Sequence, residues 1–69
     1  MNKSILTARE KEIFNYLILD KTTKDISEEL GISDKTIRNH ISNVIQKLSV
    51  KTRYQAVIEL IKMGELNIK

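Results

Sequence analysis

The chain is organised around residues 22–48, which read TTKDISEELGISDKTIRNHISNVIQKL. Gly31 divides this stretch, because glycine takes a positive φ at little cost and commonly follows the last residue of a helix. Thr23 on one side and Ser33 on the other have the side chains of good N-caps. The pattern predicts a short helix over 24–30, a tight turn, and a longer helix over 34–48.

The predicted helix over 34–48 has two different faces. Apolar side chains recur at helical spacing on one face, namely Ile37, Ile41, Val44, Ile45 and Leu48. The opposite face is polar and partly basic, with Lys35, Arg38, Asn39, Ser42, Asn43 and Gln46. We expect the apolar face to pack on the protein body and the polar face to point outward.

The flanking segments predict two more helices. Thr7-Ala8-Arg9-Glu10 has the pattern of a capping box, and Ile13, Phe14, Leu17 and Ile18 follow at helical spacing, which gives a helix over about 8–19. Thr52 can cap a last helix over 53–63, ahead of Gly64, with a core face of Ala56, Val57, Leu60 and Ile61. The chain has no proline, so we expect an all-α domain of four helices over 6–69, preceded by a short arm over 1–5.

Positive charge is concentrated in one part of the chain. The net charge is +3, but residues 33–54 carry five Lys or Arg against Asp34 alone, a balance of +4. This concentration is expected when one element faces a polyanion, although a solvated helix face can also be basic.

A short helix, a tight turn and a longer helix form a unit in which the two helices cross steeply. A helix with side chains is about as wide as the major groove of B-DNA, so the polar face of 34–48 can enter that groove. Arg38 can donate twice to guanine and Asn39 can pair with adenine. Ser42 and Asn43 complete the predicted set of base-contacting residues. The alternative is a helical module that binds another protein without reading DNA.

The sequence offers no support for an enzyme. His40 is the only histidine, and the pattern gives it neither a catalytic partner nor companion metal ligands, so we predict no catalytic residues, metal or cofactor. No apolar run approaches the roughly 20 residues of a membrane span, which predicts a cytoplasmic protein.

Most of the chain resembles the LuxR-type DNA-binding domain. The matching motifs, in order, are Leu6-Thr7-x-Arg9-Glu10, Glu12-Ile13, Lys24-Asp25-Ile26, Leu30-Gly31-Ile32-Ser33, Lys35-Thr36-Ile37-Arg38-Asn39-His40, Lys47-Leu48-x-Val50 and Arg53-x-Gln55-Ala56-Val57. The segments at 20–24 and 63–66 are most similar to a stand-alone regulator of spore-forming bacteria. Because few residues precede the first motif, either the protein is such a stand-alone regulator or a regulatory domain is missing, and Met1 favours the first.

The resemblance implies a bacterial transcription regulator that binds duplex DNA as a homodimer, with RNA polymerase as a further candidate partner. It implies that the third helix reads bases. Predicted phosphate-contacting residues are Thr22, Thr23, Lys24, Ser33, Lys35, Thr36, His40, Lys47 and Arg53. The fourth helix is expected to pair two subunits through Tyr54, Ile58, Ile61 and Lys62. Its surplus apolar surface could instead cover the C-terminal tail.

Some positions depart from the family pattern or serve the scaffold. Lys21 and Ser49 stand where family members usually have glycine, and Ser27 replaces a small apolar residue. A hydroxyl at Ser27 needs a backbone acceptor if it faces the core. The resemblance further implies that Arg9 and Glu10 hold the first helix to the body.

Overall fold

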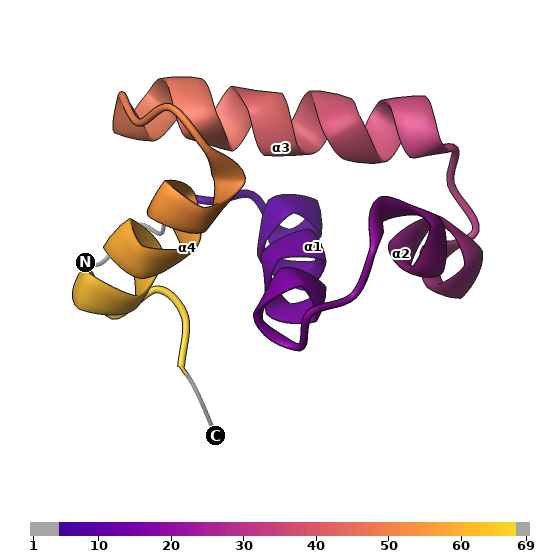
Figure 1. Cartoon of the computed structure of the whole chain (residues 1–69), viewed down its shortest axis with the longest axis horizontal. Coiled ribbons are helices and arrows are strands. Elements are labelled where there is room, and N and C mark those ends of the chain that lie inside the picture. Colours follow the sequence, from indigo (N-terminus) through magenta and orange to yellow (C-terminus); the bar gives the residue numbers. More distant parts are fainter. Residues whose placement is uncertain (1–4, 68–69) are drawn as a thin grey trace.

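The computed structural model describes residues 5–67, which form four helices and no strand (Figure 1). The helices are α1 (Ala8–Ile18), α2 (Thr23–Leu30), α3 (Asp34–Leu48) and α4 (Arg53–Lys62). α3 packs against each of the other three, and α1 also packs against α4. The prediction of a four-helix, all-α fold is confirmed. Of the predicted N-terminal arm, residues 1–4 lie outside the described residues, as do residues 68–69 at the other end.

Every helix begins at a residue whose hydroxyl accepts a hydrogen bond from the backbone N–H three positions later. These N-caps are Thr7, Thr22, Ser33 and Thr52. Thr7 forms the predicted capping box with Glu10, and Ser33 and Thr52 cap α3 and α4 as predicted. Each cap satisfies a backbone donor that the helix itself leaves unpaired.

The predicted N-cap of α2 was wrong by one residue, because Thr22 and not Thr23 occupies that position. Thr22 forms a capping box with Asp25: its hydroxyl accepts from the Asp25 N–H at 3.0 Å, and its own N–H donates to the Asp25 carboxylate at 3.1 Å. Hydrogen bonding to the Asp25 carboxylate, first by the backbone N–H of Thr22 and second by the Thr22 side chain, lowers the pKa of Asp25. Thr23 therefore becomes the first residue of α2.

Three of the turns contain a residue with a positive φ. Gly31 ends α2 at φ 68°, as predicted. Ser49 takes the same left-handed region at φ 56°, where the family pattern has glycine. After α1 the positive φ of 63° belongs to Asp20, so Lys21 needs no special backbone conformation. α1 and α4 each end one residue earlier than predicted, a difference within the ordinary spread of helix ends.

The core lies beneath α3. Its ten buried apolar residues are Leu6, Ile13, Phe14, Ile26, Ile37, Ile41, Val44, Ala56, Leu60 and Leu66. α3 contributes Ile37, Ile41 and Val44, as its apolar face predicts. Leu6 and Leu66 were not predicted, because they lie outside the helices and belong to no periodic pattern. The Ser27 hydroxyl donates to the carbonyl oxygen of Ile32, which provides the acceptor that a core-facing hydroxyl requires.

A buried carboxylate joins α1 to α3. Glu10 is only 3% exposed, and the ammonium group of Lys47 lies 2.6 Å from its Oε1 atom. Lys47 also donates to the carbonyl oxygen of Ile5, and the Thr7 N–H donates to Glu10. The structure therefore confirms that Glu10 holds α1 to the body, whereas Arg9 pairs with Glu12 on its own helix.

Two opposing effects set the pKa of Glu10. Burial raises it, but hydrogen bonds from Lys47 and Thr7, together with the charges of Lys47 and His40, lower it by more. As a result, the pKa of Glu10 lies below the usual value for a glutamate, and its carboxylate is ionised at neutral pH.

We predict that Glu10→Gln lowers the free energy of unfolding by about 1–3 kcal/mol, because it leaves Lys47 without its charged partner in a partly buried site. Urea unfolding at neutral pH measures the change. The matched control is Glu12→Gln, which removes a carboxylate from the exposed pair on the same helix and should cost at most about 1 kcal/mol. Equal losses in the two variants would contradict the role assigned to Glu10.

The same pair predicts a dependence of stability on pH. Because the folded-state pKa of Glu10 is lowered, its stabilising contribution is complete above the unfolded-state pKa and is lost as the pH falls through the folded-state pKa. The difference in unfolding free energy between the wild type and Glu10→Gln should therefore shrink below about pH 5. Urea unfolding of both proteins from neutral to acidic pH tests this, and a constant difference would exclude it.

Candidate nucleic-acid interface

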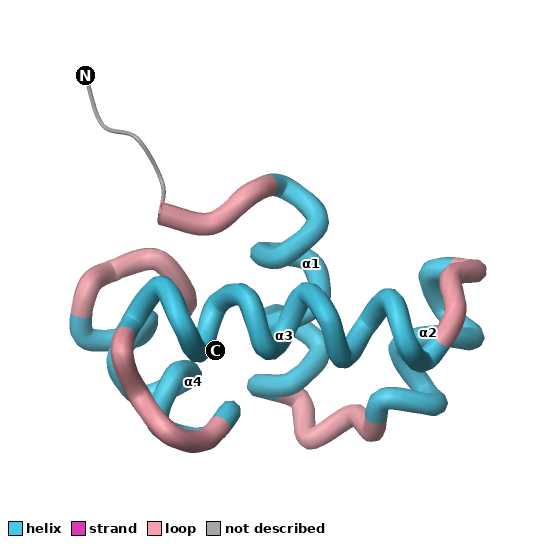
Figure 2. Tube along the Cα trace, turned by 90° about the horizontal axis from the view of Figure 1, so that it is seen from above, coloured by secondary structure: helices cyan, strands magenta, loops and turns pink. Residues whose placement is uncertain are grey.

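The outer face of α3 is free of protein contacts along its length. α1, α2 and α4 all lie on one side of α3, and Figure 2 shows it crossing in front of them when seen from above. Six residues of this face are exposed, namely Lys35, Arg38, Asn39, Ser42, Asn43 and Gln46. The structure therefore places all four predicted base-contacting residues on one open surface.

Short-range bonds fix the turn between α2 and α3. The N–H groups of Gly31 and Ile32 both donate to the carbonyl oxygen of Ser27, at 2.9 and 3.3 Å. The Ser27 hydroxyl returns a hydrogen bond to Ile32, and Ser33 caps α3. Ile26 and Ile37, one from each helix, are both completely buried. These contacts hold α3 at a defined angle to α2, and its outer face projects from the body as a ridge.

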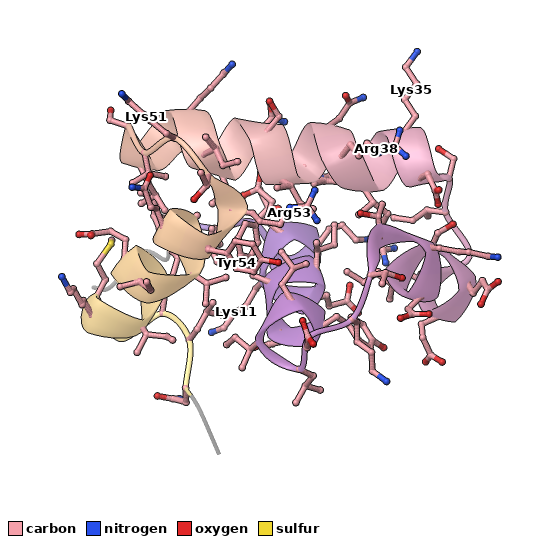
Figure 3. All side chains as sticks on the ribbon, in the orientation of Figure 1. Lys11, Lys35, Arg38, Lys51, Arg53 and Tyr54 are labelled. Atoms are coloured by element: carbon pink, nitrogen blue, oxygen red, sulfur yellow. The ribbon has the colours of Figure 1, made fainter. Side chains whose placement is uncertain are left out.

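Cationic side chains lie on this ridge and around it. Lys35 and Arg38 lie near the start of α3, Lys51 lies beyond its end, and Arg53 lies beneath it at the start of α4 (Figure 3). Lys35 points away from the protein body. The basic stretch identified in the sequence therefore borders the outward face of one helix.

The predicted phosphate-contacting residues fall into two main groups. Thr22, Thr23 and Lys24 lie at the start of α2, where Arg53 joins them by donating to the Thr23 hydroxyl at 3.4 Å. A groove of about 250 Å³ opens beside this group, lined by both threonines and Arg53. Ser33, Lys35 and Thr36 form the second group at the start of α3. Sequence reasoning missed the bond between Thr23 and Arg53, because 30 residues separate the two positions.

His40 and Lys47 are placed differently from the other predicted phosphate contacts. His40 is half-buried, and its charge contributes to lowering the pKa of Glu10. The ammonium group of Lys47 is bound to Glu10 and Ile5. Lys47 therefore helps to hold α1 to α3, and contact of either residue with phosphate stays a prediction.

All four residues predicted for a dimer interface lie on α4. Tyr54 is 71% exposed and Ile58, one turn later, is 54% exposed. Lys62 is exposed as well, whereas Ile61 is partly buried and packs against the core. The tail up to residue 67 thus leaves Tyr54 and Ile58 largely uncovered. Leu19, at the end of α1, is a further exposed apolar residue that the sequence reasoning did not single out.

Residues 5–67 contain no group of three or more His, Cys, Asp or Glu side chains that could hold a metal ion. None of the described helices has the length and apolar character needed to cross a lipid bilayer.

A short helix, a glycine turn and a longer helix with a free, polar and basic face define a helix-turn-helix DNA-binding domain. The family model described as "Bacterial regulatory proteins, luxR family" matches residues 4–60. The chain belongs to this family, as the resemblance in its motifs predicts. It is therefore a DNA-binding transcriptional regulator and not an enzyme.

Individual relatives agree with this assignment. The chain is 61% identical to the spore germination protein GerE of Bacillus subtilis over 67 residues, covering 97% of this chain and 90% of the relative. It is 43% identical to the transcriptional regulatory protein DegU of Brevibacillus brevis, covering 94% of this chain but only 28% of the relative. A solved structure of the transcription factor GerE superimposes with a TM-score of 0.94 at 58% identity, covering 97% of this chain and all of that one.

We predict that Lys35→Ala weakens binding to mixed-sequence duplex DNA and lowers the slope of log affinity against log salt by about 1, because one phosphate contact is lost. Titrations at several salt concentrations measure both quantities. Lys11→Ala is the matched control, since it removes the same charge from the exposed side of α1, away from α3 (Figure 3). If both variants changed the slope equally, net charge rather than the position of Lys35 would be responsible.

Proposed function

We propose that the protein regulates transcription by binding specific sequences of double-stranded DNA with α3 in the major groove. The observation that carries this proposal is the uncovered outer face of α3, which presents amide, hydroxyl and guanidinium groups together. These groups match the donors and acceptors at base edges, and the helix has the width that the groove admits.

Within this proposal, residues divide by what they contact. Arg38, Asn39, Ser42 and Asn43 read base edges from the middle of the ridge. The two groups of threonines, serine and basic residues at the starts of α2 and α3 bind phosphates and set the register of the protein on the duplex. The phosphate contacts supply affinity that depends on salt, and the base contacts supply the choice of sequence.

We further propose that two copies bind together through α4. Tyr54 and Ile58 offer an apolar strip that one copy leaves exposed. Pairing of these strips about a two-fold axis would place two α3 helices on one side of the dimer. The DNA site would then consist of two inverted halves.

We propose the biological setting by similarity to the relatives. High identity to a spore germination protein supports a role in gene expression during sporulation, in the bacterial cytoplasm and on nucleoid DNA. The exposed Leu19 at the end of α1 is a candidate for an additional contact with a protein such as RNA polymerase. In the rival function, a protein-binding module that does not read DNA, this contact would be the principal one.

Selection of bound duplexes from a random-sequence pool at about 150 mM salt tests the proposed function, because non-specific binding is weakened there. Enrichment of a motif with two inverted halves is the expected result. A single half-site would retain sequence reading but remove the requirement for a dimer. Absence of any enriched motif with folded protein would reject sequence-specific binding and favour the protein-binding alternative.

On the enriched duplex, we predict that Arg38→Ala costs about 1–3 kcal/mol of binding free energy and relaxes the preference at one base position. Affinities for the enriched duplex and its single-base variants measure this. An equal loss on every variant would mean that Arg38 contacts only phosphate.

A further inference from the structure

The outer face of α3 includes one acidic side chain next to its arginine. Asp34 is the first residue of α3, and its Oδ2 atom lies 3.9 Å from Nη2 of Arg38, one helical turn later. Asp34 is also the only acid among residues 33–54. A negative charge on a surface that approaches phosphates opposes binding, so its position beside Arg38 calls for a physical explanation.

The pair is exposed and can be remodelled. The Arg38 side chain is 66% exposed and that of Asp34 is 45% exposed. Ion pairs of this kind contribute little to stability, because water solvates both partners and salt screens them. Asp34 therefore adds little to the fold through this contact. What its carboxylate can do is attract the guanidinium group of Arg38 toward the start of α3.

The chemistry of the guanidinium group links this attraction to the sequence of the DNA. A guanidinium carries several N–H donors in a fixed fork, so Arg38 can donate two hydrogen bonds to guanine O6 and N7 and still face Asp34. Where the base lacks the paired acceptors of guanine, phosphate oxygens compete for the guanidinium group. Turning toward a phosphate separates Arg38 from Asp34 and leaves the carboxylate close to the anionic backbone.

We propose that Asp34 is a specificity-determining residue that acts through Arg38, by restraining its guanidinium and so disfavouring phosphate contacts on the wrong sequence. The proposal rests on the proposed function, with Arg38 as a base-reading residue. Asp34 itself is a positioning residue and need not touch the DNA. Its effect is on the ratio of affinities for right and wrong sequences.

The test compares two probes at about 150 mM salt. They are the best duplex enriched from the random pool and a duplex of the same composition with its bases shuffled. Asp34→Asn should raise affinity for the shuffled duplex about fivefold, the size expected for one charge near a surface arginine, and change affinity for the enriched duplex by less than about twofold. The specificity ratio then falls. Asp34→Glu keeps the charge within reach of Arg38 and should retain the ratio.

Two further variants separate restraint of Arg38 from simple charge. Asp20→Asn removes one negative charge from the turn between α1 and α2, beside the predicted phosphate contacts at the start of α2 but not next to Arg38, and asparagine tolerates the positive φ found there. This variant should leave the ratio unchanged. In an Arg38→Ala background, Asp34→Asn should also leave the ratio unchanged, because the group through which it acts is absent.

The outcomes are distinguishable. If Asp34→Asn raised affinity for both duplexes by the same factor, Asp34 would act only as a charge and the proposal would be overturned. It would also be overturned if the variant lowered the melting temperature with no change in the ratio, because that result assigns Asp34 to the helix N-terminus alone. A wild type unable to distinguish the two duplexes would instead reject the proposed function, and with it the role of Asp34.

Discussion

The structure depends on burial of the inner face of α3. In a chain of 69 residues the core is thin, since so small a domain buries a modest fraction of its surface. Ile37, Ile41 and Val44 project from α3 into that core, and α1, α2 and α4 all pack against them from one side. No described element remains to cover the opposite side. The need to bury one face of a long amphipathic helix therefore also leaves its other face available for recognition.

Two local devices give this arrangement a defined geometry. The glycine turn and the return hydrogen bond from Ser27 set α2 against α3, and the ion pair between Glu10 and Lys47 pins α1 to the opposite part of α3. Both devices involve polar groups in or near the core, where an unsatisfied donor or acceptor is costly. Among the described residues, no buried side-chain nitrogen or oxygen lacks a partner. The ridge that carries Arg38 and Asn39 thus rests on a body in which the buried polar side-chain atoms of the described residues all have hydrogen-bond partners.

Lysines and arginines that appear equivalent in the sequence have different tasks in the fold. Lys35 extends from the ridge, Lys47 neutralises a buried carboxylate, and Arg53 bridges to Thr23 at the start of α2. Arg38 faces an acid on its own helix. Only some of the positive charge is therefore free to neutralise phosphates, and part of it serves to hold the reading helix or to direct its side chains.

The sequence by itself determined the four helices, most of the core and the face of α3 that points outward. These features depend on short-range chemistry: hydroxyl caps three residues before their targets, apolar side chains at helical spacing, and a glycine where φ is positive. Even the error at Thr22 was local, because an acid at the third helical position selects the earlier threonine as cap. Only the tertiary structure decided that Lys47 meets Glu10 across 37 residues of sequence, that Arg53 meets Thr23, and that Leu6 and Leu66 close the core. Such contacts join segments with no periodic relation in sequence, so their partners are set by how whole helices pack.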